Sequence, residues 1–458
     1  MKEWIKNRKE LLSKISNKKE RKYVEFLLGV AEETLNFSQP SSFLSNNIKI
    51  EKNSLIYKKN KITFDKNANF CLISFGKAAE TMANWFIVNS PYFFNQILVS
   101  SPDETSDKIK EMSNCHFFKG GHPIPNDESI NSAKKAIKIL SKLKQEDVCF
   151  FLISGGGSSL FELPIIKMNS YVKLMKLLLS SGATIHEINT IRKHFSQIKG
   201  GKIVNYTSAN IYSFIISDVP GNDPTNIASG PTVMDTTTWE DCKRIIRKYK
   251  IEKRLPKEAK EILQNRQKQK KHETPKNKEK FNKVNNILIG SNQIVIDHLK
   301  EKILKQNDIK GKIISYNIEG EAAKVGKWLA KKYVKKYPQE RAFLWGGETT
   351  VKLPKETANI GKGGRNQELA LSFALKIRNN KKAYLIEFGT DGIDGNSDAA
   401  GAIVGPFTID SKLRKKQAKE SLKKHDTNSF FHKHKGEIIT GYTGTNVMDI
   451  GILIIPED

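Results

Sequence analysis

The chain has 458 residues, of which 38% are hydrophobic, and it carries a formal net charge of +28. This length favours two or three domains, and the hydrophobic fraction excludes a disordered chain. The charge comes mostly from lysines spread along the whole chain, without zinc-finger spacing or RNA-binding strand motifs, so we expect a lysine-rich surface and no nucleic-acid partner.

The first half of the chain alternates predicted helices and strands. Residues 1–36 have the pattern of amphipathic helices. Three later segments, 69–89, 147–160 and 211–221, each begin with an apolar run and continue into a glycine turn. Strands that alternate with helices indicate an α/β domain with a mainly parallel sheet, and ligands bind at the carboxyl ends of such strands.

Residues 264–285 contain almost no apolar side chains and are predicted to be exposed. Strand-like segments resume after them, with helical patterns in between, which indicates a second α/β domain. The predicted domains are therefore 1–265 and 285–458, joined by a lysine-rich connector at 266–284.

The cysteines and the N-terminus indicate the compartment. The four cysteines are far apart and form no CxxC pair, which favours a reducing environment. The charged N-terminus lacks a signal or transit peptide, and no apolar run approaches the roughly 18 residues of a membrane span. We expect a cytoplasmic protein that contacts no membrane.

The segment 154–159, Ser-Gly-Gly-Gly-Ser-Ser, directly follows the apolar run 148–153. A glycine-rich turn between a strand and a helix gathers backbone N–H groups, and the helix N-terminus adds partial positive charge. The loop is therefore predicted to bind an anion, with Ser154, Ser158 and Ser159 as hydroxyl donors. The alternative is a tight turn that lets the helix pack closely on the sheet.

This loop matches none of the well-known glycine motifs. A Walker A loop needs Gly-Lys-Ser/Thr, which is absent. A dinucleotide-binding fingerprint and a hydrolase nucleophile elbow both need a glycine where Leu160 stands.

Basic and acidic residues follow other strand-like runs and glycine turns. Such cations neutralise phosphate charge, and such carboxylates hold magnesium, so together they predict phosphoryl transfer. Taken singly, each is equally consistent with a turn or a solvated helix face. The basic residues are Lys77, Arg192, Lys193, Lys199 and Arg365, and the acidic ones are Asp218, Asp391, Asp394 and Asp398.

A series of motifs from about residue 70 to the C-terminus resembles the class II glycerate kinase family. They are "GKAAETMA", "GGHPIP", "LISGGGSSLFELP", "SGATIHEINTIRKHFSQIKGGKI", "SDVPGNDPTNIASGPTV", "GGETTV", "GKGGRNQELAL", "GTDGIDGNSDAAGA" and "TGYTGTNVMDIGILI". The resemblance implies an N-terminal Rossmann-like α/β/α domain with a mainly parallel sheet. It also implies a smaller C-terminal α/β domain, called MOFRL, and an active site in the cleft between the two.

The resemblance further implies phosphorylation of D-glycerate to 2-phosphoglycerate with ATP and Mg²⁺. The family's catalytic lysine and arginine correspond to Lys77 and Arg365, and Asp218 and Asp391 are the expected magnesium ligands. The expected phosphate- and substrate-binding residues are Ser154, Gly155, Gly156, Gly157, Ser158, Ser159, Asn189, Arg192, Lys199, Glu348 and Gly364.

Two alternatives stay open at this point. One is phosphorylation at the 3-hydroxyl, and the other is an NAD(P)-dependent hydroxypyruvate reductase, which would need the dinucleotide fingerprint that is missing here. The expected partners are D-glycerate and a nucleotide, and the sequence leaves a homodimer open.

Overall fold

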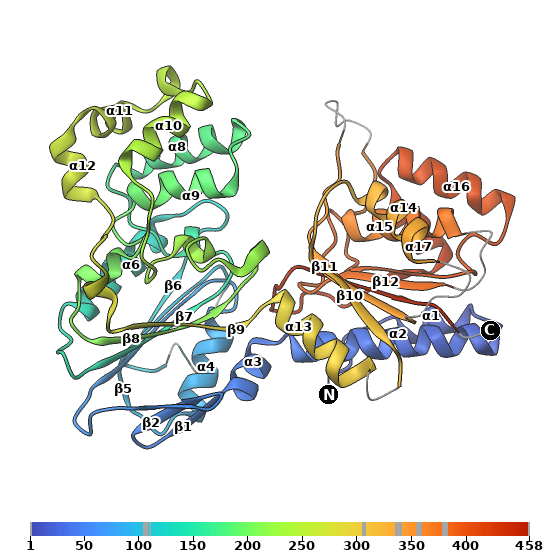
Figure 1. Ribbon diagram of the computed structural model, residues 1–458, viewed down its shortest axis with the longest axis horizontal. Coiled ribbons are helices and arrows are strands. Elements are labelled where there is room, and N and C mark those ends of the chain that lie inside the picture. The colour runs from blue at the N-terminus through green and yellow to red at the C-terminus, as the bar shows by residue number, and fades with distance from the viewer. Residues whose placement is uncertain are drawn as a thin grey trace. The chain divides into compact units, whose positions relative to one another are not determined.

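A computed structural model of the protein describes residues 2–103, 109, 111–304, 308–334, 341–353, 360–377 and 383–456. The chain forms two compact units (Figure 1). We call Phe43–Ile289 the central unit, and we call Met1–Ser42 together with Gly290–Asp458 the terminal unit.

In the main sheet of the central unit, β6 pairs with β5, β5 with β4, β4 with β7 and β7 with β8, and all four pairs are parallel. Its strand order is β6 (Cys115–Lys119), β5 (Phe94–Ser101), β4 (Phe70–Phe75), β7 (Val148–Ile153), β8 (Asn210–Ile216) and β9 (Val284–Gly290). The chain therefore starts this sheet in the middle, at β4, and reverses its direction of growth between β4 and β7. In doubly wound folds, ligands bind beyond the carboxyl ends of the strands at such a reversal.

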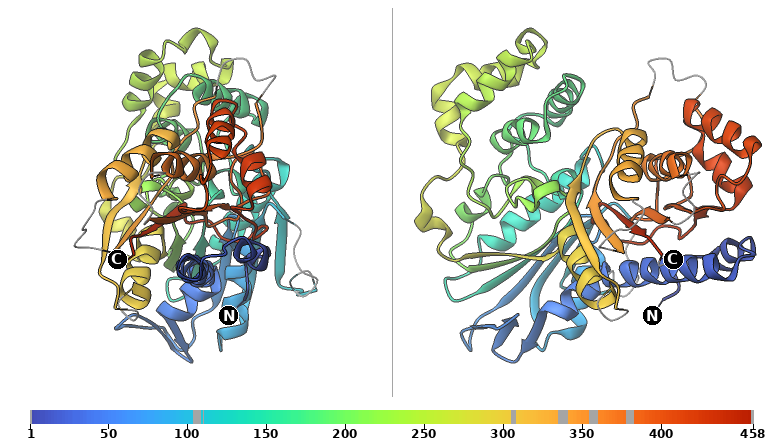
Figure 2. Two further views of the ribbon diagram at one scale, coloured as in Figure 1. Left: turned by 90° about the vertical axis from the view of Figure 1, so that its right-hand side faces the viewer. Right: turned by 45° about the vertical axis from the view of Figure 1, so that its right-hand side comes forward.

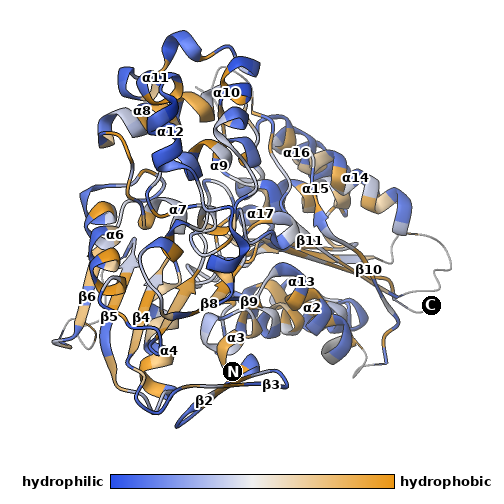
Figure 3. Cartoon of the chain, turned by 60° about the vertical axis from the view of Figure 1, so that its left-hand side comes forward, coloured by the Kyte–Doolittle hydropathy of each residue, from blue (hydrophilic) through white to orange (hydrophobic). Residues whose placement is uncertain are grey.

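Side chains that alternate along the strands bury both faces of this sheet. Phe150 of β7 lies 5.4 Å, centroid to centroid, from Phe86 of α4 (Ala79–Asn89). The next residue, Phe151, faces the other way and shares a core with Ala133 and Ala136 of α6 (Asp127–Leu140). Figure 3 shows the hydrophobic residues gathered along strands such as β4.

Helices inserted between the strands form a second core in the central unit, which includes Leu174, Ile191 and Trp239. These helices are α8 (Met168–Ser180), α9 (Ile185–His194), α10 (Trp239–Lys248) and α11 (Lys257–Gln264), and α12 (Arg266–His272) follows them. Helix α3 (Pro40–Asn47) spans the chain boundary between the two units. The remaining elements of the central unit are β1 (Ile48–Glu51), β2 (Ser54–Tyr57), β3 (Asn60–Thr63), α7 (Gly157–Leu160), η1 (Lys202–Asn205), η2 (Pro220–Asn222), η3 (Ile227–Ser229), η4 (Glu252–Arg254) and η5 (Lys278–Phe281).

The terminal unit contains a mixed sheet, in which β10 and β11 are parallel and the other pairs are antiparallel. Its strand order is β10 (Gly311–Ile318), β11 (Ala342–Gly347), β15 (Asp449–Ile454), β12 (Tyr384–Gly389), β13 (Gly401–Val404) and β14 (Glu437–Ile438). Its helices are α1 (Arg8–Ser13), α2 (Lys18–Phe37), α13 (Asn292–His298), η6 (Leu299–Leu304), α14 (Ala322–Tyr333), α15 (Arg365–Ile377), α16 (Lys412–Lys423) and α17 (Thr427–His434). Helices α14 and α15 lie on one face of this sheet and α2 lies on the other (Figure 2). The expectation of a two-domain α/β protein with a mainly parallel sheet is confirmed, and that sheet has six strands.

The units differ from the sequence-based domain ranges at both boundaries. Residues 1–42 belong to the terminal unit, where Tyr23 of α2 stacks on Tyr384 of β12 at 5.1 Å and Thr445 Oγ1 donates to Ser38 O. The segment 266–284 belongs to the central unit and is anchored by polar side chains. These contacts are long-range and do not follow a local periodicity, so the sequence pattern does not reveal them.

Gln269 and Thr274 provide that polar anchoring. Both side chains are buried. Gln269 Nε2 donates to Leu263 O at 2.7 Å, and Thr274 Oγ1 donates to Asp235 Oδ2 at 3.1 Å. A segment can therefore pack on a domain without the apolar residues that predict burial.

Candidate active site

The loops that follow β4 and β7 are joined by hydrogen bonds. Lys77 N donates to Gly155 O at 2.8 Å, and Ala78 N donates to Ser154 Oγ at 3.0 Å. Gly76 lies in the left-handed region with φ +124°, and a Cβ there would stand 2.2 Å from Ser154 Oγ. Only glycine fits at residue 76. Because it allows the two loops to approach closely, Lys77 lies against the 154–159 loop, at the point where the strand order reverses.

The glycines of this loop make room for three side chains from other segments. A Cβ on Gly155 would lie 2.0 Å from Asp218 Oδ2. A Cβ on Gly156 would lie 2.9 Å from His122 Cδ2 and 3.3 Å from Lys77 Cγ. The missing side chains thus allow a carboxylate, an imidazole and an ammonium group to approach one short stretch of backbone.

Lys77 is close enough to these two neighbours to influence their protonation. Burial raises the pKa of Asp218, and the positive charge of Lys77 acts in the opposite direction. Burial lowers the pKa of His122, and the charge of Lys77 lowers it further. The sequence indicated Lys77 and Asp218 but not His122, whose one signal is its place in the motif "GGHPIP".

Ser158, Asn189 and Arg192 form a second polar cluster, which Ser229 holds together. Ser229 Oγ lies 2.9 Å from Ser158 Oγ and donates to Asn189 Oδ1 at 3.1 Å. Arg192 Nη1 donates to the same Asn189 oxygen at 2.8 Å. The structure therefore assembles three of the expected binding residues in one network and adds Ser229, which was not among them.

Lys199 supports the glycine loop from inside the protein. Its side chain is fully buried, and its Nζ donates to Gly157 O at 2.9 Å. It lies 5.8 Å from the ring centroid of Phe75 and 5.7 Å from that of Phe161, and burial lowers its pKa to about 7. Lys199 was expected to bind phosphate or substrate. That role stays a prediction, and the contact that the structure shows is a hydrogen bond to the backbone of the glycine loop.

Ser159 also faces inward, with its side chain donating to Gly156 O at 3.2 Å. Ser154, as described above, caps the neighbouring loop through its hydroxyl. Two of the three serines expected to donate hydroxyl groups to an anion therefore bond to backbone groups of the two loops.

In the terminal unit, Arg365 is the first residue of α15 and forms ion pairs within that unit. Its Nε and Nη2 donate to the two carboxylate oxygens of Asp449 at 2.5 and 2.8 Å. Its Nη1 lies 3.3 Å from Glu348 Oε1. Arg365 and Glu348, two of the expected site residues, are thus neighbours, and the buried Asp449 at the start of β15 orients the guanidinium.

Asp394 fixes the start of α15. Its carboxylate accepts from Asn366 N at 3.0 Å and from Gln367 N at 2.9 Å, and burial raises its pKa to about 7. A Cβ on Gly364 would lie 2.2 Å from Asp394 Oδ1. Gly364 was an expected binding residue, and this contact gives it a role in letting Asp394 reach the helix N-terminus.

The two expected magnesium ligands fit that role unequally. Asp218 is a partly buried carboxylate beside the glycine loop, and Mg²⁺ needs one or two such groups together with substrate phosphates. Asp391 Oδ1 accepts from Ile393 N at 3.1 Å, which is the bond of a local turn. In the part of the chain that the structure describes, no three His, Cys, Asp or Glu side chains are grouped to hold a metal ion.

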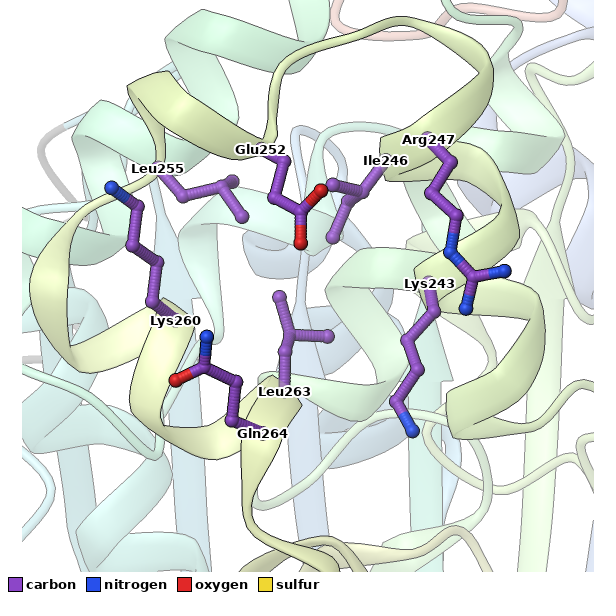
Figure 4. Close-up of a pocket in the computed structure, with 8 residues that line it drawn as sticks. All are labelled: Lys243, Ile246, Arg247, Glu252, Leu255, Lys260, Leu263 and Gln264. Atoms are coloured by element: carbon purple, nitrogen blue, oxygen red, sulfur yellow. The ribbon is translucent and has the colours of Figure 1, made fainter.

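A pocket elsewhere in the central unit contains none of the expected residues (Figure 4). It measures about 100 Å³ and lies between α10 and α11, with Lys243, Arg247 and Lys260 around Glu252. It is far smaller than the roughly 300–1,000 Å³ of a typical ligand pocket. The candidate site of this unit is placed at the strand ends around Lys77 by the residues that meet there.

A parallel sheet with a basic, glycine-rich site at its reversal point defines an α/β protein suited to phosphate chemistry. The family described as "Domain of unknown function (DUF4147)" matches residues 26–264, and the MOFRL family matches residues 341–449. The glycerate 2-kinase of Pyrococcus horikoshii is 36% identical over 444 residues, which are 94% of this chain and 97% of that protein. The chain therefore belongs to the class II glycerate kinase family and is a kinase.

Two further similarities are relevant to the fold and to the alternatives. The crystal structure of glycerate kinase from Thermotoga maritima has a TM-score of 0.80 at 30% identity, and the match covers 94% of this chain and 99% of that chain. An Agrobacterium vitis protein with the provisional name hydroxypyruvate reductase is 38% identical over 74% of this chain and 77% of its own length. Across the described ranges, no helix is long and apolar enough to cross a membrane.

Proposed function

We propose that the protein transfers the γ-phosphoryl group of ATP to the C2 hydroxyl of D-glycerate and forms 2-phosphoglycerate and ADP. The observation that carries this proposal is the meeting of Lys77, Asp218 and the 154–159 loop at the reversal point of the sheet, in a chain of this family. The Pyrococcus relative, whose name is glycerate 2-kinase, supports the position of the phosphorylated hydroxyl.

In the proposed reaction, the C2 oxygen of glycerate forms a bond to the γ-phosphorus. The bond between that phosphorus and the β–γ bridging oxygen breaks, and ADP leaves. Lys77 neutralises charge on the phosphoryl oxygens, which is the main catalytic contribution in this class of reaction. The hydroxyl proton passes to His122, which is able to accept it because burial and Lys77 favour its neutral form.

Magnesium, when bound with the nucleotide, neutralises phosphate charge, and Asp218 is the residue that we propose to hold it. We expect Asp218→Asn to raise the Mg²⁺ concentration for half-maximal rate by about tenfold or more. Asp391→Asn should leave that concentration nearly unchanged, since the Asp391 carboxylate bonds to its own turn. A magnesium titration of both variants tests this assignment, and equal behaviour of the two would contradict it.

Product analysis tests the proposed activity directly. The protein is incubated with ATP, Mg²⁺ and D-glycerate, and the product is examined by phosphorus NMR without proton decoupling. Phosphate on C2 couples to one proton and gives a doublet, whereas phosphate on C3 couples to two protons and gives a triplet. A triplet would move the reaction to the 3-hydroxyl, and the absence of phosphoglycerate would overturn the proposal.

The reductase alternative is tested in the same samples with hydroxypyruvate and NADPH. In dinucleotide-binding folds, the first turn after the central strand carries a GxGxxG fingerprint. Here Lys77 and Ala78 follow Gly76 in that turn, so the second glycine is missing. We therefore expect no NADPH oxidation.

A further inference from the structure

A cavity of about 480 Å³ opens beside Arg365 in the terminal unit. Its lining includes the apolar side chains of Val351, Leu353 and Ile360, and Leu353 leaves 50% of its surface exposed. The lining also includes glycines, among them Gly363 and Gly364. An exposed leucine at the mouth of a cavity is typical of a surface that an apolar ligand covers.

The glycine side of the cavity is held in place by side-chain bonds to its backbone. Asn396 Oδ1 accepts from Gly363 N at 2.8 Å, and its Nδ2 donates to Gly361 O at 3.2 Å. Asp426 Oδ1 accepts from Lys362 N at 3.0 Å. These bonds hold the backbone of residues 361–363 in place beside the cavity.

The lining of the cavity also carries charged groups. Arg365 supplies a cation, and its Nη1 lies 3.3 Å from the Oε1 of Glu348, another residue of the lining. Elsewhere in its lining, Glu368 pairs with His425, whose Nδ1 lies 3.2 Å from Glu368 Oε2. A ligand with an apolar part and an anionic tail would meet both apolar side chains and a guanidinium group in this lining.

We infer that this cavity binds the nucleoside part of ATP, with the base between the apolar side chains and the glycine loop and with the phosphates toward Arg365. This inference rests on the proposed function, which supplies the nucleotide. D-Glycerate is the other expected ligand, but it is a small polar anion that gains nothing from contact with Leu353 or Ile360. The volume also lies in the range of pockets that hold drug-sized ligands.

Binding of ADP alone, measured by titration calorimetry, tests the inference. Leu353→Asp places a carboxylate on the apolar wall, and Val351→Trp fills the cavity without adding charge. We expect both variants to bind ADP at least about tenfold more weakly and to raise the KM for ATP, while the KM for D-glycerate stays unchanged. Leu413→Asp, a change at a 65% exposed leucine of α16, is the matched control and should bind ADP like the wild type.

Several outcomes would overturn the inference. They are unchanged ADP affinity in both cavity variants, an effect restricted to the KM for D-glycerate, and an equal loss in Leu413→Asp. Thermal unfolding of each variant verifies that it is folded. The titration needs no turnover, so a failure of nucleoside binding at this cavity can be distinguished from a failure of the proposed kinase reaction in the wild type.

Discussion

Lys77 and Arg365, the two cations expected to act on the phosphoryl group, have different surroundings. Lys77 influences the protonation of Asp218 and His122 beside the 154–159 loop. Arg365 pairs with Asp449, which is 2% exposed. Replacing Lys77 should therefore affect catalysis alone, whereas replacing Arg365 also leaves a buried carboxylate without its partner.

We expect Lys77→Ala to lower kcat by about 10² or more with an unchanged melting temperature. Arg365→Ala should lower kcat and also destabilise the fold by about 3–5 kcal/mol. Arg365→Lys keeps the charge but loses the two-pronged bond to Asp449, so it should also be impaired. The measurements are kcat and thermal midpoint on the same preparations.

The double variant Arg365→Ala/Asp449→Asn separates the two effects. It should recover much of the lost stability, because the buried charge is gone, while its activity stays low. Turnover at the wild-type rate in Lys77→Ala would contradict the mechanism. A wild-type melting temperature in Arg365→Ala would contradict the role assigned to the ion pair.

His122 should set the acid limb of the pH–rate profile. Burial, and then Lys77, lower its pKa from 6.5, so the neutral base persists to a lower pH than an ordinary histidine allows. Activity should therefore persist to a lower pH than an ordinary histidine would allow, and it should fall as the pH drops through the lowered pKa of His122. In His122→Gln we expect a rate lower by about 10²–10⁴ and no such limb.

The matched control is His116→Gln. His116 lies on β6, and its ring bonds to Gln96 at 3.1 Å. This variant should keep both the rate and the acid limb. An acid limb that persists in His122→Gln would assign the proton transfer to another group.

At the scale of secondary-structure elements, the 154–159 loop depends on its glycines, because their missing side chains let the Asp218 carboxylate approach the backbone closely. A methyl group on Gly155 would collide with the Asp218 carboxylate. We expect Gly155→Ala to displace Asp218, to lower kcat by about tenfold or more and to raise the Mg²⁺ requirement. Gly29→Ala is the control, because nothing lies within 4 Å of that position inside α2, and alanine there should stabilise the helix by up to about 1 kcal/mol.

A second substitution reveals whether the collision causes the defect. The stability lost in Gly155→Ala should return in Gly155→Ala/Asp218→Ala, although the activity should not. Equal melting temperatures of Gly155→Ala and the wild type would show that the loop tolerates the methyl group.

Sequence patterns locate this loop well and describe its surface poorly. Apolar runs mark β4 and β7, and the rule for strand ends then places Lys77 beside residues 154–159, as the structure shows. The interior position of Lys199 was not predictable, because a lysine in a basic segment has the same sequence signal whether it faces solvent or a carbonyl group. His122 was missed for a related reason, since it lies outside any periodic segment and reaches the loop through tertiary packing.

At the scale of the whole molecule, the terminal unit needs both ends of the chain. Helix α2 packs Val24, Leu27 and Leu28 in the interior, and Asn7 bonds to Glu437 O at 2.8 Å. A fragment of residues 290–458 should therefore melt well below the full chain, because one face of its sheet loses its cover. Adding residues 1–42 as a separate peptide should raise its melting temperature, as followed by circular dichroism.

The central unit provides the comparison. Residues 43–289 have their own cores and should fold as a separate fragment. If residues 290–458 melt like the full chain without the added peptide, the domain ranges read from the sequence are the better description. The sequence alone could not settle this division, since no local pattern shows that residue 23 stacks on residue 384.

The order of the strands also determines when the protein can become active during its synthesis. Strand β15 follows every other described strand along the chain, yet it lies between β11 and β12 near the middle of the terminal sheet. Until the ribosome has released residues 449–454, the backbone groups of β11 and β12 that pair with β15 have no partner strand, and Arg365 lacks Asp449. The central unit can fold while translation continues, whereas the terminal sheet and its arginine are completed last, so we expect a nascent chain to lack activity until that point.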